Sequence, residues 1–129
     1  MKNFKLKALS TLIAVSALVG FGTSHAAEFA AGPMYGGLNQ NVVVCYLYNA
    51  GTTAVSISGQ IIRLGVGPLA LTSNSCTASF VGGGMCGMSA AAVAGAAYGC
   101  KFSVSDAVNL RGTLEIRQQG IVLQNTPLR

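Results

Sequence analysis

Four cysteines restrict the fold of this chain more than any other feature of its sequence. Cys45, Cys76, Cys86 and Cys100 are even in number, and all of them follow an N-terminal segment that is typical of an export signal. Exported chains of this size commonly form disulfides, and four cysteines allow three pairings. The sequence therefore predicts a small exported domain that is stabilised by two disulfides.

The export signal is predicted over residues 1–26, MKNFKLKALSTLIAVSALVGFGTSHA. Three lysines precede an almost uncharged apolar run from Ala8 to Phe21. This run is too short for a transmembrane helix, which needs about 20 apolar residues. Small residues at the expected positions predict cleavage between Ala26 and Ala27. No second apolar run of spanning length follows, so we expect no membrane span in the mature chain and a periplasmic or extracellular location.

Charged groups are few once this segment is removed. The only histidine, His25, is lost with it, and five cations against three carboxylates leave a net charge of +2. These scattered cations do not form the basic patch that binds nucleic acid. Without histidine, acid–base catalysis has few candidate groups, so we expect no enzyme, no catalytic residue and no cofactor. The eight groups are Arg63, Lys101, Arg111, Arg117 and Arg129 against Glu28, Asp106 and Glu115.

Short alternating stretches separated by glycine turns indicate β-strands. In residues 41–49 both alternating sets are apolar, Val43, Cys45 and Leu47 against Val44, Tyr46 and Tyr48, which predicts a central strand. A strand is favoured over a short helix for residues 86–98, and a hairpin with a Gln119-Gly120 turn is predicted near the end. About seven such strands predict an all-β antiparallel sandwich over residues 40–129, after a flexible lead-in at 27–39 for which a strand is the alternative.

The stretch CYLYNAGTTAVSI, from Cys45 to Ile57, resembles the first strands of immunoglobulin-like domains of the abnormal-spindle and hydin type. A frequent second element of those domains is matched by Cys76 and Cys86, ten positions apart, although Gly82 stands where they have a proline. Further matches are the apolar pair Phe80 and Val81, the loop glycine Gly83, and the closing-strand positions Gly112, Leu114 and Ile116.

A closer similarity, through Tyr98, Cys100 and Arg111, is to uncharacterised small secreted bacterial proteins that consist of one immunoglobulin-like sandwich. This resemblance covers about residues 40–129 and implies an immunoglobulin-like fold. Its motifs are structural, so it implies no catalytic residue.

Disulfides Cys76–Cys86 and Cys45–Cys100 are the pairing that we predict. A tight turn at the three glycines would place Cys76 opposite Ala90, so a Cys76–Cys86 bond requires a wide loop over residues 77–85. Cys45 and Cys100 then remain, each on the inward side of an apolar strand. In the chain-entropy treatment the two bonds contribute roughly 3 and 4 kcal/mol, respectively.

The functional prediction is a non-enzymatic binding or accessory module for an unknown protein or small ligand, with a candidate contact surface at Tyr46, Tyr48, Phe80 and Met85. For Tyr46 and Tyr48 a position in the core is favoured over exposure on such a surface. One alternative is a structural subunit, surface or fimbria-like, that self-associates through its edge strands. A second alternative is periplasmic copper binding by Cys76, Cys86 and Met88, because thiolate and thioether sulfurs suit copper(I).

Overall fold

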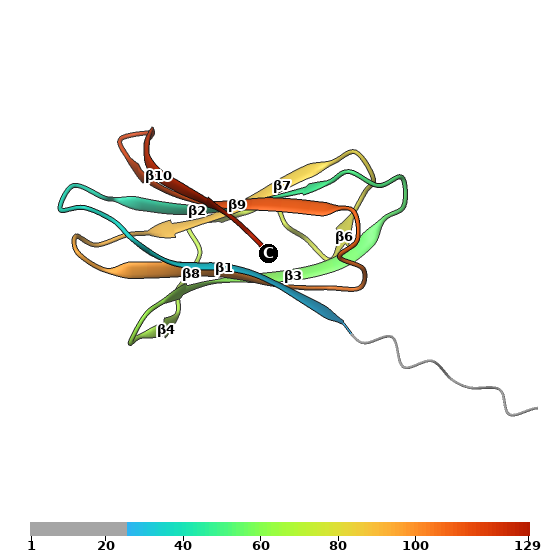
Figure 1. The fold of residues 1–129 in the computed structure, drawn as a ribbon, viewed down its shortest axis with the longest axis horizontal. Coiled ribbons are helices and arrows are strands. Elements are labelled where there is room, and N and C mark those ends of the chain that lie inside the picture. Colours follow the sequence, from blue (N-terminus) through green and yellow to red (C-terminus); the bar gives the residue numbers. More distant parts are fainter. Residues whose placement is uncertain (1–25) are drawn as a thin grey trace, which may run out of the picture.

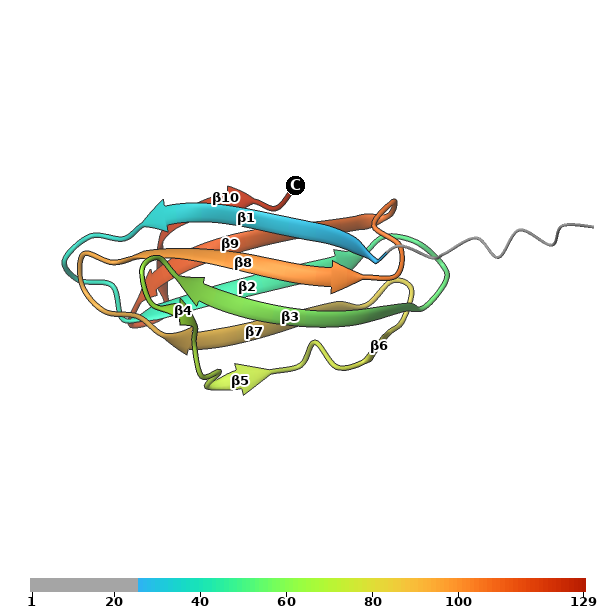
Figure 2. The same cartoon turned by 90° about the horizontal axis from the view of Figure 1, so that it is seen from below.

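The computed structural model describes residues 26–129 and folds them into two antiparallel β-sheets, without a helix in that part of the chain (Figures 1 and 2). The predicted all-β sandwich is thus confirmed. Seven strands are long and three have only two residues. The predicted signal peptide falls on residues of which all but Ala26 lie outside the described part.

Sheet A has the strand order β1-β8-β3-β4, and β6 pairs with the start of β3. Its strands are β1 (Ala27–Tyr35), β8 (Ala97–Val104), β3 (Val55–Arg63), β4 (Gly67–Pro68) and β6 (Ser79–Phe80). Sheet B has the order β10-β9-β2-β7-β5, so the predicted central strand β2 is indeed central. Its strands are β10 (Ile121–Pro127), β9 (Leu110–Gln118), β2 (Val42–Asn49), β7 (Met85–Ala91) and β5 (Ser73–Asn74).

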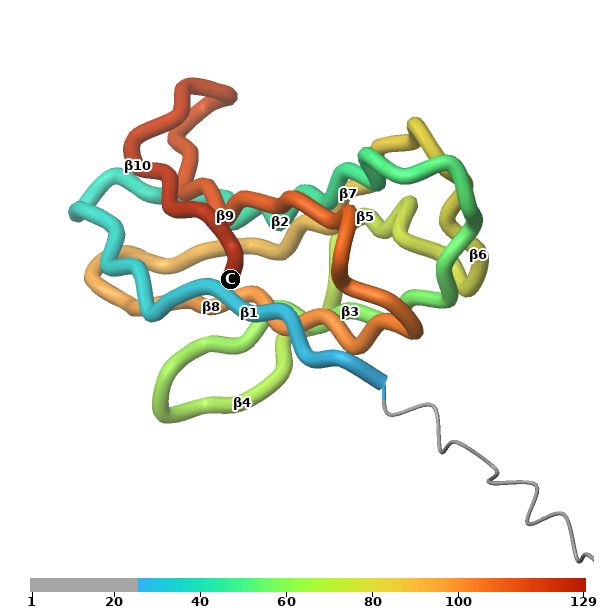
Figure 3. The backbone as a smooth tube through the Cα atoms, turned by 45° about the vertical axis from the view of Figure 1, so that its right-hand side comes forward, coloured from blue at the N-terminus to red at the C-terminus, as the bar shows by residue number. Residues whose placement is uncertain are grey.

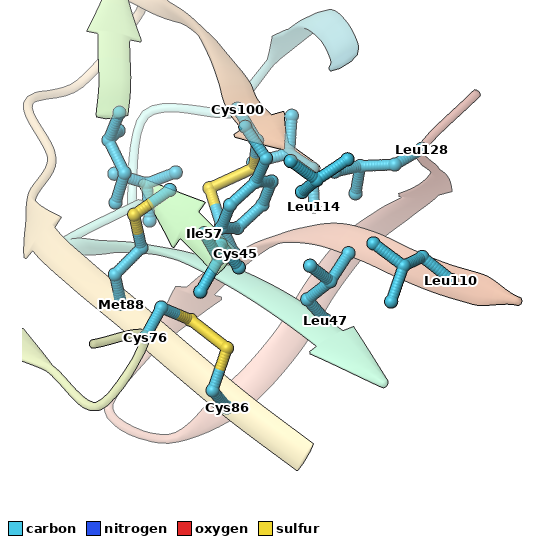
Figure 4. Packing of buried hydrophobic residues seen from close by; sticks show 14 of the residues in the cluster. Cys45, Leu47, Ile57, Cys76, Cys86, Met88, Cys100, Leu110, Leu114 and Leu128 are labelled. Atoms are coloured by element: carbon cyan, nitrogen blue, oxygen red, sulfur yellow. A yellow bond between two sulfur atoms is a disulfide. The ribbon is translucent and has the colours of Figure 1, made fainter. Parts of the chain in front are cut away.

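The core lies between the two sheets, where alternate residues of the long strands other than β10 point inward (Figure 4). Val43, Cys45 and Leu47 of β2 are fully buried. They pack in one cluster with Phe102 of β8 and with Met88 of β7. Met88 is therefore a core residue, and its burial stabilises the sandwich through the apolar area that it removes from water.

Both predicted disulfides are present and confirm the predicted pairing (Figure 4). Cys45–Cys100 joins β2 of sheet B to β8 of sheet A across the core, with 6.0 Å between the Cα atoms. Cys76–Cys86 closes the segment before β7, with 5.0 Å between the Cα atoms. The first disulfide links the two layers, whereas the second fixes one border of sheet B.

Tyr98 lies two residues before Cys100, and its hydroxyl oxygen accepts a hydrogen bond from the backbone N–H of Val93 at 2.7 Å. A tyrosine at this position that bonds to backbone a few residues upstream, together with a disulfide between the sheets, is typical of immunoglobulin-like sandwiches. The terminal strands differ from that pattern. β1 pairs with β8, where an immunoglobulin domain has its last strand, and β9 pairs with β2, where it has its first.

The prediction of a flexible lead-in is wrong for residues 27–35, which form β1. Ala27 to Ala31 pair with Val104 to Cys100, and Phe29 packs against the core. The C-terminal Arg129 also exchanges two backbone hydrogen bonds with Ala30 of β1, at 2.9 and 3.0 Å. The lead-in has few alternating residues of its own, so its strand depends on partners that lie far away in the sequence.

The predicted strand at residues 86–98 is interrupted: β7 ends at Ala91, residues 92–96 form a turn, and β8 begins at Ala97. The predicted hairpin is confirmed: Gln119 and Gly120 connect β9 to β10 with φ angles of 48° and 86°. Two successive positive φ angles are characteristic of the turn that fits the twist of a two-residue hairpin, and glycine adopts them without steric cost.

Within the predicted wide loop, β6 adds a short pairing to β3.

Candidate binding surface

The outward side chains of β2 form an apolar row on the exposed face of sheet B. Tyr48 is 44% exposed and lies between Met85 of β7, which is 71% exposed, and Arg111 of β9. Tyr46, one position further along the row, is half-buried. We refer to Tyr46, Tyr48, Met85 and Arg111 as the tyrosine surface. These four residues help to line a hollow of about 270 Å³ in the outer face.

Tyr46 is held in place from two sides. Its direct neighbour on β7 is Gly87, and a Cβ atom at that position would lie 2.9 Å from two carbons of the Tyr46 ring. On the other side the Arg117 guanidinium lies 5.4 Å from the ring centroid, a distance at which a cation is attracted to an aromatic face. The ring is therefore a fixed part of the surface, and Tyr48 and Met85 are its open part.

The two arginines of this face differ in their partners. Arg117 donates from Nε to Glu115 Oε2 at 2.9 Å, and this hydrogen bond is the main reason why the pKa of Arg117 is raised above its usual value. Arg111 instead donates to the backbone oxygens of Leu110 and Val108, at 2.7 and 3.4 Å. Neither of the two ion pairs in residues 26–129 includes Arg111. Arg111 thus supplies a positive charge that a partner's carboxylate can neutralise.

A second hollow, of about 470 Å³, runs along the outer side of β7 toward β5. Its hydroxyl groups are used within the protein: Ser89 Oγ lies 2.9 Å from Thr72 Oγ1 and 2.8 Å from Ser73 Oγ. Ser75 Oγ donates to the carbonyl of Gly87 and accepts from its N–H. These bonds attach the segment around β5 to sheet B, so we do not assign the hydroxyls to a ligand.

The structure brings together three of the four predicted contact residues. Tyr46, Tyr48 and Met85 share one face, whereas Phe80 is only 5% exposed and is wrong as a contact residue. The reason is the pairing of β6 with β3, which places Phe80 opposite Val55 and turns its ring into the core. The sequence reasoning missed Arg111 as a surface residue, although its alternation with Gly112 in the closing strand could have placed it outward.

The copper hypothesis is wrong for the chain with its disulfides formed. Cys76 and Cys86 are bonded to each other, so neither offers the thiolate that copper(I) would require. Met88 is fully buried in the core. Among residues 26–129 no group of three or more His, Cys, Asp or Glu side chains is arranged to hold a metal ion.

The three described carboxylates lie on separate elements and do not form a cluster. Glu28 of β1 pairs with Lys101 of β8 at 2.6 Å on the outer face of sheet A. Glu115 pairs with Arg117 on sheet B, and Asp106 accepts a hydrogen bond from the backbone N–H of Val108 at 2.9 Å. Each carboxylate therefore has its own local partner.

In the described part of the chain, no helix has the length and apolar character needed to cross a membrane. Comparisons with protein-family models, with curated proteins and with solved structures find no match to this chain.

Proposed function

We propose that the protein is an exported, non-enzymatic binding module that contacts a partner protein through the tyrosine surface. The observation that carries the proposal is the exposure of Tyr48 and Met85 beside Arg111 on the outer face of sheet B. Aromatic residues, methionine and arginine are the residue types enriched in protein–protein interfaces. They also surround a hollow in which a partner side chain can be buried.

Export is supported by two features of the chain. Both disulfides require an oxidising compartment to form and persist, which fits the periplasm or the extracellular space. Residues 1–26 have the composition of a secretory signal. We also propose a relationship to small secreted bacterial immunoglobulin-like proteins, supported by the disulfide between the sheets and by the Tyr98 hydrogen bond.

A non-enzymatic role is supported by the environment of the charged groups. Glu28 and Lys101 neutralise each other, and so do Glu115 and Arg117. General acid–base catalysis needs a positioned side chain that can take up or release a proton at the reacting group. Asp106, in the loop before β9, is the remaining carboxylate of the described part and lies apart from both pairs.

Site-specific photo-crosslinking in cells that export the chain tests the proposed surface. A photoreactive phenylalanine analogue is placed at Tyr48 or Met85, and matched control variants carry it at Ser58 or Gln60 on the outer face of sheet A. We expect the two positions on sheet B to yield a discrete crosslinked species that contains a second protein. The two control positions are expected to yield none.

Equal crosslinking from both sheets would contradict the proposal, because the tyrosine surface would then have no special role. A crosslinked species with the mass of two copies of this chain would also contradict it, because the contact would then be self-association. Crosslinking from Ser58, without crosslinking from Tyr48 or Met85, would show that the binding surface lies on sheet A.

A further inference from the structure

The four sheet edges of the sandwich differ in how much they expose. β5 and β4 are two-residue strands, too short to serve as templates for another strand. β1 is interrupted by a bulge between Ala31 and Met34, and the C-terminal Arg129 occupies the backbone groups of Ala30. Short strands, bulges and covering segments are the usual ways in which proteins prevent edge-to-edge pairing.

β10 has little of this protection. It is seven residues long, and none of its residues is buried. Ile121 is 69% exposed, and Val122 and Leu123 are also exposed, because the tip of the β9–β10 hairpin projects away from the two layers (Figure 3). A hollow of about 610 Å³ separates part of β10 from β1, so the edge is not covered from that side. Its partial protection is a bulge at Leu123 and a proline at the last position, Pro127.

The backbone of β10 suits a second copy of itself. Gln118 and Ile121 flank the two-residue turn as its hydrogen-bonded pair. The alternation of an antiparallel ladder, shifted by one residue at the Leu123 bulge, then turns the N–H and C=O groups of Val122 and Asn125 away from β9. In a two-fold antiparallel pair, Val122 of one copy faces Asn125 of the other. This register uses the free groups of both residues on both copies at once.

Charge also favours a second copy over a charged partner. No charged residue occurs between Gln118 and Leu128. Within each copy, Val122 lies opposite Arg117 and Asn125 lies opposite Glu115. In the same register the row across the joined sheet therefore reads Arg117 and Val122 of one copy, then Asn125 and Glu115 of the other. Each such row contains one positive and one negative residue, and no row contains two like charges. A two-fold axis places the same edge segment of both copies side by side, and a segment without charged residues meets no electrostatic repulsion there.

We propose that two copies of this chain pair antiparallel through β10, with Val122 of one copy opposite Asn125 of the other, so that their two sheets B form one continuous sheet. The apolar side chains of Ile121, Val122 and Leu123 are covered in this pair. The tyrosine surface lies at the other end of β2 and remains open, so self-association and partner binding are independent.

Sedimentation velocity of the purified chain with both disulfides formed, from low to high micromolar concentration, tests the pairing. We expect a reversible monomer–dimer equilibrium. Val122→Lys should raise the dimer dissociation constant at least tenfold, because it brings two charges to the interface. Leu64→Lys, which adds the same charge to the exposed turn between β3 and β4, should leave it unchanged.

Val122→Pro separates strand pairing from simple hydrophobic contact. Proline keeps the residue apolar but removes the N–H that points away from β9, a position at which an edge strand tolerates proline. The dimer should be lost in this variant while thermal unfolding remains cooperative. A dimer that survives both Val122 substitutions, or a wild-type chain that is monomeric at every concentration, would overturn the proposal.

Disulfide trapping tests the register. A mixture of Val122→Cys and Asn125→Cys chains should form a crosslinked heterodimer on mild oxidation, because the paired Cα atoms lie at the about 5.5 Å of a hydrogen-bonded pair. Either variant alone should crosslink much less. Equal crosslinking of Val122→Cys with itself would show a different register and would contradict the proposed pairing.

Discussion

The outward faces of the two sheets have opposite character. On sheet A the outward residues of β3 and β8 are polar or small apart from Ile62 near the end of β3, with Ser56, Ser58 and Gln60 beside Lys101 and Ser103. On sheet B the central strand β2 presents a valine or tyrosine at each outward position from Val42 to Tyr48. A two-layer sandwich has no third layer to cover such a row. The difference shows that the apolar outer row of sheet B is not explained by the fold alone.

The outer row of sheet B itself has two parts. Val44 is only 7% exposed and lies between Ser89 of β7 and Glu115 of β9. Arg117 starts opposite Val42 but contacts the Tyr46 ring, so its side chain runs past Val44. Tyr48 and Met85, at the other end, have no such cover. We therefore interpret the Val44 end as structural and the Tyr48 end as available for binding.

Val44→Asp should have the largest effect among the substitutions that test this comparison. It places a carboxylate at a nearly buried position directly opposite Glu115, so we expect a loss of about 3 kcal/mol in the free energy of unfolding. Ser58→Asp on the outer face of sheet A should change it by no more than about 0.5 kcal/mol. Urea denaturation with the disulfides intact measures both, and equal losses would contradict a structural role for Val44.

Tyr98→Phe tests how the buried tyrosine of sheet A is held. Tyr98 accepts a hydrogen bond from the Val93 N–H, whereas Tyr46 of sheet B is packed between Gly87 and Arg117. The substitution leaves the Val93 N–H without its partner, which should cost about 1.5 kcal/mol. Hydrogen exchange at the Val93 amide should accelerate by more than the global loss of stability explains. Unchanged exchange at Val93 would show that another group accepts this hydrogen bond.

Gly87→Ala tests the stacking that fixes Tyr46 on sheet B. The new Cβ atom would overlap the Tyr46 ring, so we expect a loss of about 1 kcal/mol in the free energy of unfolding. In a Tyr46→Ala background the same substitution should become neutral or stabilising by about 0.5 kcal/mol, because alanine is favoured over glycine within a strand. Denaturation of the four chains of this cycle gives the coupling, and a coupling of zero would contradict the packing of Tyr46 on Gly87.

Much of this architecture could be predicted from local sequence. Alternation placed Cys45 and Cys100 on inward positions, and the Gln119-Gly120 pair marked the hairpin. Phe80 could not be placed, because its burial depends on the pairing of β6 with β3, which is separated from it in the sequence. β1 was predicted only as the alternative to a flexible lead-in for the same reason: Phe29 joins the core only through the ladder that β1 forms with β8. The surface role of Arg111 likewise depends on the strand order, which places it next to Tyr48.

Tyr48→Thr combined with Met85→Thr should have the smallest effect on stability and the clearest effect on binding. Both side chains already contact solvent, and threonine suits a strand, so the free energy of unfolding should change by about 0.5 kcal/mol or less. In the crosslinking test described above, the probe replaces Tyr48 or Met85, so it cannot be combined with threonine at both positions. The probe is therefore placed at Thr113, which lines the same hollow. Partner crosslinking from Thr113 should then fall at least tenfold in the double variant. If stability falls by as much as in Val44→Asp, Tyr48 and Met85 are structural, and the two parts of the outer row are not distinct.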